Sequence, residues 1–322
     1  MVTIRKNKRI KVSVIMSKLK VCVHGLGNIG KYSIEAIEAA SDMECVGVVR
    51  RASSIGKNKN DLRGVDEYSS VEDLIKAKGK PDVCLIATPS RHAFDDDSLY
   101  LKHGINTVDS FDIHTEITEI VEKLDKVAKE NNAVSVTAAG WDPGSDSVMR
   151  AMMEAMMPVG VTFTNFGRGR SMGHSAAARA VEGIKDAVSI TIPMGGGRHS
   201  RLVYVVLEDG ISLEEAKRRI GSDDYFAHDP LDVKAVANSE ELAMVCDSSH
   251  GVFIEKQGAS GLTDNQRMSF KMEINNPALT SQIMVSCARA ASRLNSGCYT
   301  MIDIPPVLYL NMDRMTAIKK LV

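Results

Sequence analysis

A glycine-rich turn is the part of this sequence whose residue types and spacing point most directly to chemistry. The residues Gly25-Leu26-Gly27-Asn28-Ile29-Gly30 follow an apolar run at 21–24 and precede a helical pattern at 31–40. Between a strand and a helix, the first glycine makes a tight turn, the second admits a pyrophosphate, and the third allows close helix–strand packing. Free N–H groups at the start of the helix then hold the anion. We therefore predict a dinucleotide site at these residues.

Two arginines occupy the position that selects between NAD and NADP. Arg50 and Arg51 end a predicted strand at 44–49, about 20 residues beyond the glycines. An acidic residue there would bind the ribose 2′-hydroxyl of NAD, whereas the planar fork of arginine matches the 2′-phosphate of NADP. We predict NADP as the cofactor, with a solvated basic strand end as the alternative interpretation.

Two carboxylates are the candidate catalytic groups. Asp112 follows a predicted strand at 106–109 and Asp142 follows one at 133–137, so both belong to the sheet edge that carries the glycine turn. Two carboxylates beside a nicotinamide suit a cationic substrate nitrogen. A helix N-cap remains the alternative for Asp112, and a turn residue the alternative for Asp142. The sequence has no HExxH motif, zinc-type cysteine cluster or GxSxG turn, and we predict no metal.

A parallel sheet is needed to position these groups. Strand-like and helical runs alternate from residue 21 to residue 136, which predicts an α/β fold with a Rossmann-type doubly wound sheet. The predicted strands are 21–24, 44–49, 82–87, 106–109 and 133–137, and the predicted helices are 31–40, 71–78, 95–102 and 116–130. Ligands bind at the carboxyl ends of such strands. Residues that follow two of the strands are expected to line the cofactor: Thr88, Pro89, Ser90, Asp109 and Ser110.

A second, mixed α+β unit is predicted after residue 144. A methionine-rich helix at 147–157, whose methionines we expect in the core, leads into alternating β-rich runs. Alternation is typical of a sheet packed on one face only. A last long helix is predicted at 277–293. Polar residues of this unit that could bind a carboxylate are Thr191, Arg201, His250 and Asn276, with an ordinary strand-surface charge as the alternative for Arg201.

Composition excludes several classes of protein. With a net charge of −1 and 25% charged residues, the chain is not expected to bind nucleic acid or a membrane surface. No apolar run approaches the roughly 18 residues of a membrane span. The six cysteines form no CxxC pair and suggest a reducing, cytoplasmic environment. The first 17 residues form a basic leader that we expect to be disordered or to precede a true start at Met16, and we expect residues 1–15 to be dispensable.

Several longer strings resemble the meso-diaminopimelate D-dehydrogenase family. They are His24-Gly-Leu-Gly-Asn-Ile-Gly30, Val49-Arg-Arg51, Thr107-Val-Asp-Ser-Phe-Asp-Ile-His114, Ala139-Gly-Trp-Asp-Pro-Gly144, Ser171-Met-Gly-His-Ser175 and Ile274-Asn-Asn-Pro-Ala278. The resemblance extends from Leu19 to the C-terminus and favours the branch with broad D-amino-acid tolerance. It implies an NADP-dependent homodimer or higher homo-oligomer of lysine biosynthesis. Such enzymes oxidise the D-centre of meso-2,6-diaminopimelate to an imine, which water converts to L-2-amino-6-oxoheptanedioate and ammonia.

The resemblance also implies domain limits and residue roles. A dinucleotide-binding domain at 18–145 would be completed by 278–322, and 146–277 would bind the substrate and form the dimer. Asp112 and Asp142 would lie near the D-centre ammonium. The substrate-binding residues would be Trp141 and Phe166 as pocket walls, Met172 and Gly173 along the substrate chain, Thr191 and Arg201 at a carboxylate, and His250 and Asn276 at the distal L-centre.

One departure from the family pattern leaves the preferred substrate open. Where the family has Gly-Pro-Gly followed by an apolar residue, this chain has Gly167-Arg168-Gly169-Arg170. The two added guanidiniums could grip a second carboxylate or be solvated. Two other functions also stay open: a related NADP-dependent D-amino-acid or diamino-acid dehydrogenase, and a non-catalytic NADP-sensing protein.

Overall fold

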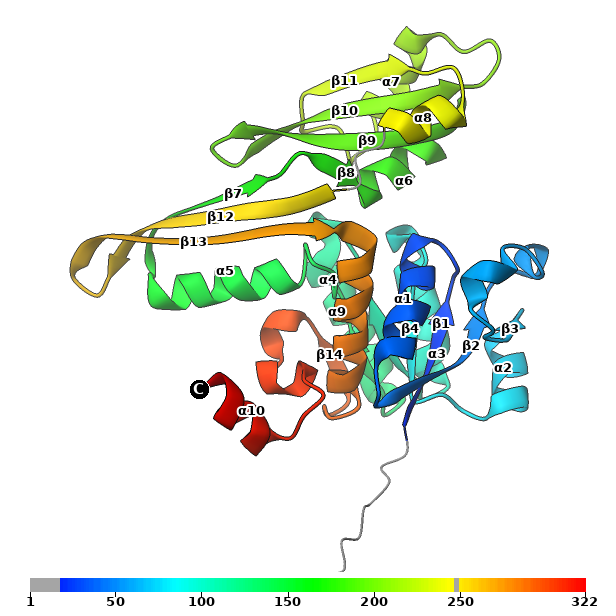
Figure 1. Ribbon diagram of the computed structural model, residues 1–322, viewed down its shortest axis with the longest axis vertical. Helices are drawn as coiled ribbons and strands as arrows, with labels where there is room; N and C mark the ends of the chain where they lie inside the picture. The colour runs from blue at the N-terminus through cyan, green and yellow to red at the C-terminus, as the bar shows by residue number, and fades with distance from the viewer. Residues whose placement is uncertain (1–17, 246–248) are drawn as a thin grey trace, which may run out of the picture.

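The computed structural model describes residues 18–245 and 249–322, so the expected leader at 1–17 lies outside the described residues. Three sheets follow one another along the long axis of the molecule (Figure 1). A seven-stranded sheet with its helices forms one end and a four-stranded sheet forms the other. A three-stranded sheet with a long hairpin lies between them. The predicted site residues therefore meet where the first sheet faces the other two.

The seven-stranded sheet is parallel throughout, which confirms the predicted Rossmann-type fold. Its order is β14-β6-β5-β4-β1-β2-β3, with β1 (Leu19–His24), β2 (Met43–Val49), β3 (Glu67–Tyr68), β4 (Val83–Ile86), β5 (Asn106–Asp109), β6 (Val134–Val136) and β14 (Gly297–Tyr299). Two helices, α1 (Asn28–Ala39) and α9 (Asn276–Ala291), cover one face of the sheet. The other face is covered by α2 (Val71–Lys78), α3 (Ala93–Lys102) and α4 (Ile117–Glu130).

The strand order reverses direction at β1, which lies between β2 and β4. The chain runs from β1 to β2 and β3 on one side, and from β4 to β5 and β6 on the other. Such a switch point opens a crevice at the carboxyl ends of the two central strands. Gly25 follows β1 and Thr88 follows β4, so the glycine turn and the second predicted cofactor loop flank this crevice together.

The C-terminal part of the chain returns to the first sheet. Helix α9 packs against α1, and β14 pairs with β6. Arg289 of α9 is buried and donates two hydrogen bonds to the Asp42 carboxylate, at 2.5 and 2.8 Å, and one to the carbonyl of Tyr309, at 2.9 Å. The bonded guanidinium lowers the pKa of Asp42, because it favours the ionised form. This fork fastens the returning helix to the loop before β2.

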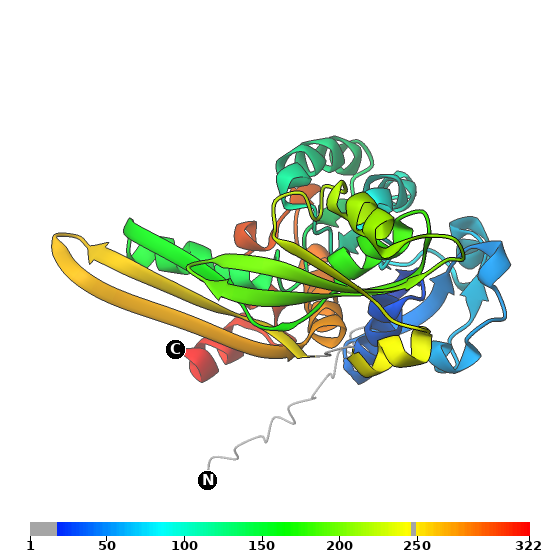
Figure 2. The ribbon, with the colours of Figure 1, turned by 90° about the horizontal axis from the view of Figure 1, so that it is seen from above.

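Two further sheets make up the rest of the molecule. In the three-stranded sheet, β12 (Ser249–Ser260) pairs antiparallel with both β7 (Val159–Phe166) and β13 (Thr263–Asn275), and α5 (Ser145–Met156) lies along it. The four-stranded sheet has the order β11-β10-β9-β8, with β8 (Gly169–Ser171), β9 (Ile184–Gly195), β10 (Arg198–Leu207) and β11 (Leu231–Ala235). Figure 2 shows the β12–β13 hairpin extending well beyond the body of the molecule.

The predicted mixed α+β architecture is confirmed, but its packing differs from expectation in one sheet. Helices α6 (Met172–Ala180) and α7 (Leu213–Gly221) cover one face of the four-stranded sheet, and α8 (Ser239–Val245) packs on the other. The prediction of one-sided packing is therefore wrong for this sheet. Along β13, by contrast, exposed and half-buried residues alternate, as a one-sided sheet requires.

The methionine-rich helix also departs from expectation. Met153 of α5 and the following Met157 are buried, but Met152 and Met156 are 51% and 48% exposed. The prediction that these methionines fill the core is wrong for the two exposed ones, because α5 covers only a narrow three-stranded sheet and leaves its outer side in solvent. Within the described ranges, the structure has no helix with the length and apolar character of a membrane span.

Candidate active site

The surroundings of the three glycines of the turn fit the geometry that their spacing predicts. Gly25 has a φ of +96°, and a Cβ there would lie 2.7 Å from the carbonyl oxygen of Ala87. A Cβ on Gly30 would overlap the carbonyl oxygen of Gly25, whereas a Cβ on Gly27 would meet nothing within 4 Å. No side chain caps α1, and its first turn has no acid. Space above Gly27 and uncapped N–H groups fit a dinucleotide pyrophosphate.

The two predicted phosphate-binding arginines have different surroundings. Arg50 is buried, forms an ion pair with Glu67, and donates a 2.6 Å hydrogen bond to the carbonyl of Lys57. Glu67 in turn accepts from the N–H of Gly56, at 2.6 Å. These contacts hold the loop after β2 in place. Arg51 is exposed at the strand end, so its guanidinium is the one turned to solvent.

Hydrogen bonds to neighbouring elements hold the residues at the ends of β4 and β5. Thr88 donates a 2.5 Å hydrogen bond to Asp96. Asp109 is buried and accepts bonds from the N–H of Phe111, at 2.7 Å, and the hydroxyl of Thr137, at 3.0 Å. Burial raises the pKa of Asp109 to about 6, against the effect of these donors. Asp109 therefore holds the ends of β5 and β6 together, and its expected contact with the cofactor stays a prediction.

Asp112 lies where the two parts of the molecule meet. Its Oδ1 accepts a 2.6 Å hydrogen bond from Ser90 of the parallel sheet edge and a 2.9 Å bond from the hydroxyl of Tyr225, which follows α7. A Cβ on Gly173, at the start of α6, would overlap Oδ2 of Asp112. The carboxylate is thus reached from both sides, and any larger residue at 173 would displace it.

Asp142 is held within a charged group on the loop before α5. Oδ1 lies 3.5 Å from Nη2 of Arg150, and Oδ2 lies 3.9 Å from Nε2 of His114. The same guanidinium lies 2.7 Å from Oδ2 of Asp146, which is fully buried, in an ion pair poorly aligned for a hydrogen bond. The sheet edge thus carries several carboxyl groups, and it is the acidic side of the site.

Aromatic side chains join the acidic side to the other sheets. Trp141 lies edge-on to Phe166 and His250, with ring centroids 5.9 and 5.2 Å apart. His199 stacks at 4.8 Å on Phe166 and accepts a 2.8 Å hydrogen bond from its N–H. The predicted pocket residues Trp141, Phe166 and His250 are therefore brought together as one aromatic cluster.

Arg201 forms the basic side of the site. Its guanidinium donates a 2.7 Å hydrogen bond to Thr191, its register partner on β9, and forms an ion pair with Asp229 at 2.6 Å. Burial lowers the pKa of His250 to about 4 and that of His174 to about 3, and the charge of Arg201 acts in the same direction. The imidazoles beside Arg201 are therefore uncharged, and the guanidinium, paired with Asp229, is the cationic group on this side of the site.

The remaining predicted residues lie at helix starts. Asn276 is the first residue of α9, is buried, and accepts a 3.4 Å hydrogen bond from Thr280. Met172 is the first residue of α6, next to Gly173. No cluster of His, Cys, Asp and Glu that could hold a metal ion occurs among residues 18–245 and 249–322.

Sequence reasoning missed several residues that touch the predicted ones. They are Tyr225 at Asp112, Asp229 at Arg201, His199 at Phe166, and Asp146, Arg150 and His114 at Asp142. Tyr225 and Asp112 are 113 positions apart, and no local pattern connects them. Asp142, Asp146 and Arg150 follow one another at intervals of four, a helical spacing that could have indicated a charged group.

Comparisons with known proteins agree with this arrangement. Residues 19–138 match the oxidoreductase family with an NAD-binding Rossmann fold, and residues 140–197 match the diaminopimelic acid dehydrogenase C-terminal domain. A meso-diaminopimelate D-dehydrogenase of Bacteroides fragilis is 46% identical over 299 residues, which are 93% of this chain and 97% of the relative. The chain belongs to the meso-diaminopimelate D-dehydrogenase family. It is accordingly an oxidoreductase with a dinucleotide-binding domain.

Two more members of the family resemble the chain over most of its length. A meso-diaminopimelate D-dehydrogenase of Lysinibacillus sphaericus is 33% identical and covers 90% of this chain and 95% of the relative. A crystal structure of a multiply substituted family member from Clostridium tetani, solved with DAP, has a TM-score of 0.82 and 27% identity, and covers 95% of this chain and 100% of that chain. The sequence resemblance to this family is thereby confirmed.

Gly27 and Gly30 of the turn provide a matched pair of variants. Gly27→Ala should keep the melting temperature within a few degrees but weaken dinucleotide binding at least tenfold, because the methyl group occupies space that a pyrophosphate needs. Gly30→Ala should lower the melting temperature as well, because its Cβ overlaps backbone. Thermal unfolding and a fluorescence titration with NADP measure both. Normal binding by Gly27→Ala would contradict the assigned site.

Proposed function

We propose that this chain catalyses the NADP-dependent oxidative deamination of the D-centre of meso-2,6-diaminopimelate to L-2-amino-6-oxoheptanedioate and ammonia, a reversible step of lysine biosynthesis. The observation that carries the proposal is the separation of charge across the site. Carboxyl groups of Asp112 and Asp142 lie at the edge of the parallel sheet, and the guanidinium of Arg201 lies on β10 among neutral histidines. This arrangement matches a substrate with an ammonium at the reacting carbon and a carboxylate at a distance.

The protein residues orient the substrate and handle its proton. A bound NADP would supply its nicotinamide ring as the acceptor of the hydride from the D-carbon. The amine must be neutral when the hydride leaves, so one proton passes first to Asp112, Asp142 or a water between them. Trp141 and Phe166 exclude bulk water from this position, which strengthens the electrostatic contacts of the substrate.

The distal end of the substrate is assigned to the four-stranded sheet and the residues beside it. Arg201 and Thr191 would hold a carboxylate, because a guanidinium fork and a hydroxyl can share its oxygens. His250 and Asn276 would engage the distal L-centre, with Met172 and Gly173 along the chain between the two ends. Asp229 keeps Arg201 in place until a substrate carboxylate arrives.

The cofactor proposal follows from the strand end at Arg50 and Arg51. Both guanidiniums add positive charge there, but only Arg51 is exposed, so we assign the direct contact with the 2′-phosphate of NADP to Arg51. Arg50 supports the loop through Glu67. Thr88, Pro89, Ser90 and Ser110 would line the cofactor at the neighbouring strand ends.

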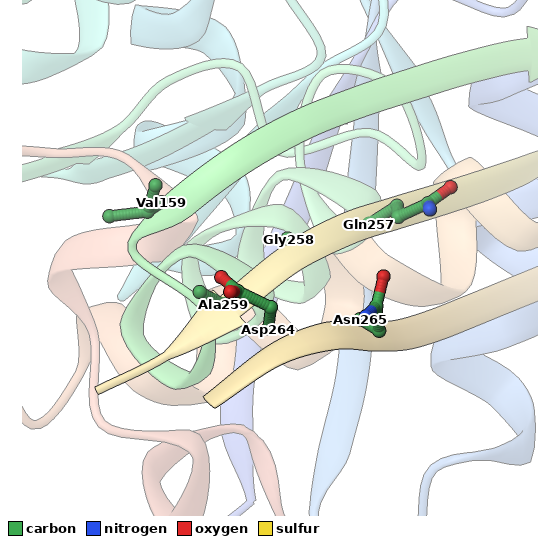
Figure 3. A pocket seen from close by; sticks show the side chains of 6 residues that line it. All are labelled: Val159, Gln257, Gly258, Ala259, Asp264 and Asn265. Carbon is green, nitrogen blue, oxygen red and sulfur yellow. The ribbon is translucent and has the colours of Figure 1, made fainter. Parts of the chain in front are cut away.

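Assembly into a homodimer or higher homo-oligomer is proposed for the 146–277 region. Val159, Val161 and Phe163 of β7 are 64%, 54% and 40% exposed, and apolar surface of this kind marks interaction sites. At the end of the same sheet, Val159, Gln257, Gly258, Ala259, Asp264 and Asn265 surround a hollow of about 380 Å³ (Figure 3). None of the proposed catalytic residues lines this hollow, so we assign it no part in the chemistry.

A substrate panel tests the reaction directly. With NADP, meso-diaminopimelate should produce NADPH absorbance faster than single D-amino acids, and L-amino acids should give none, because the two carboxyls select the D-centre nitrogen. Higher turnover with another diamino acid would favour the related dehydrogenase. Absence of any NADP-dependent amine oxidation would favour the sensing protein.

Cofactor choice is tested at the two arginines separately. Arg51→Ser should raise the KM for NADP at least tenfold, equivalent to about 1.4 kcal/mol, and leave the KM for NAD nearly unchanged. Arg50→Ser should instead lower the melting temperature, because Glu67 loses its buried partner. Steady-state kinetics with both cofactors and thermal unfolding measure the effects. Equal weakening of both cofactors in Arg51→Ser would refute the 2′-phosphate contact.

Substrate selectivity tests Arg201. Arg201→Ala should lower kcat/KM for meso-diaminopimelate, with a loss of transition-state stabilisation of roughly 2–4 kcal/mol. The reason is that the distal carboxylate loses the two hydrogen bonds of the guanidinium. Arg201→Lys should also impair it, since an ammonium cannot copy two parallel hydrogen bonds. A short neutral D-amino acid has no distal carboxylate, so its kcat/KM should change much less. If both substrates lose equally, Arg201 binds the carboxylate that they share or supports the sheet.

A further inference from the structure

The loop that carries Asp142 places a second carboxyl group, that of Asp146, against it. Three backbone hydrogen bonds close this loop: Gly140 N–H to Pro143, Ser145 N–H to Gly140, and Asp146 N–H to Trp141, at 3.0, 3.1 and 3.1 Å. Gly144 permits the closure with a φ of +141°, where a Cβ would overlap Gly140. Asp142 and Asp146, called here the carboxyl pair, both lie within 3.5 Å of Nη2 of Arg150.

One permanent positive charge faces the carboxyl pair. Arg150 lies one helical turn after Asp146, and its Nη2 is 2.7 Å from Asp146 and 3.5 Å from Asp142. His114, 3.9 Å from Asp142, is 58% exposed. From the other sheets, His199 and His250 also face Asp142, but burial lowers the pKa of both imidazoles. The N-terminus of α5 adds a partial positive charge at Asp146.

Two ionised carboxyls are one negative charge too many for this environment. The side chain of Asp146 has no exposed surface, and that of Asp142 is 10% exposed. An uncompensated buried charge is costly, and two adjacent carboxyls relieve the cost by retaining a proton. In agreement, burial raises the pKa of Asp146 to about 8, and the charge of Asp142 and a hydrogen bond between the two carboxyls add to the effect.

We propose that Asp146 is a positioning residue that retains a proton, donates it in a hydrogen bond to Asp142, and so keeps Asp142 oriented with a single negative charge. Arg150 balances that charge from the other side. Asp146 itself is buried and does not touch the substrate. The kinetic consequence rests on the proposed function, because it requires Asp142 to meet the reacting amine. The retained proton does not depend on that function.

The retained proton is tested by unfolding the full chain in urea at pH 5.5 to 7.5. A folded-state pKa raised above the unfolded value gives stability that is lost as pH rises toward the folded pKa. Relative to Asp146→Asn, the wild type should therefore lose more stability across this range, by about one linked proton. Other titrating groups contribute equally to both chains. Asp95→Asn, at an exposed position on α3, is the matched control and should keep the wild-type slope.

The positioning role is tested by kinetics at pH 7. Asp146→Asn retains a neutral donor toward Asp142, so its kcat should stay within about threefold of the wild type. Asp146→Ala removes the donor and should lower kcat at least tenfold with NADP affinity unchanged, because Asp142 loses its orientation. A kcat that is kept in Asp146→Asn but lost in Asp146→Ala separates a positioning role from a simple loss of charge.

Each outcome decides one part of the proposal. An unchanged pH slope in Asp146→Asn would show that Asp146 is ionised in the folded chain and would overturn the retained proton. A normal kcat in Asp146→Ala would overturn the positioning role. If the wild type oxidises no amine, the proposed function fails, whereas the unfolding comparison still decides whether the carboxyl pair holds a proton.

Discussion

The close approach of Gly173 to Asp112 is the contact on which the geometry of the site depends. No side chain at 173 would fit beside this carboxylate, and Ser90 and Tyr225 reach the same group from opposite sides. Through it, the edge of the parallel sheet is fixed against α6 and the loop after α7. Trp141, Phe166 and His250 then pack across the same boundary. The absence of a side chain at Gly173 therefore lets the acidic side of the site lie directly against the start of α6.

Burial decides which groups on the two sides of the site carry a charge. Around Arg201 it keeps the histidines neutral, so that the guanidinium, paired with Asp229, is the cationic group on that side. Around Asp142 it makes a second negative charge at Asp146 unfavourable. In both places the partner that compensates the charge comes from the protein itself, Asp229 for Arg201 and Arg150 for Asp142. Such preorganised partners hold a polar site in one arrangement before a substrate enters.

The return of the chain to its first sheet gives the site a rigid base. Helix α9 begins at Asn276, beside the substrate residues, and packs along α1, whose start lies at the glycine turn. The fork of Arg289 on Asp42 fastens the other end of α9. One helix therefore connects the predicted distal end of the substrate with the dinucleotide turn, and β14 adds the seventh strand to the sheet beneath.

The sequence alone determined the parts that depend on local order. Glycine spacing placed the dinucleotide turn, strand–helix alternation predicted the parallel sheet, and the positions after strands brought Asp112 and Asp142 to one edge, because parallel strands share a carboxyl end. Longer strings indicated the family and the residues Trp141, Phe166, Thr191, Arg201 and His250. Only the tertiary structure decided what each charge is paired with. In the folded chain Arg50 is paired with Glu67, and Asp109 accepts a hydrogen bond from Thr137 across two strands. Helices cover both faces of the four-stranded sheet, and Tyr225 donates a hydrogen bond to Asp112. These contacts join residues far apart in the chain, and burial, which fixes their protonation, exists only once the chain has folded.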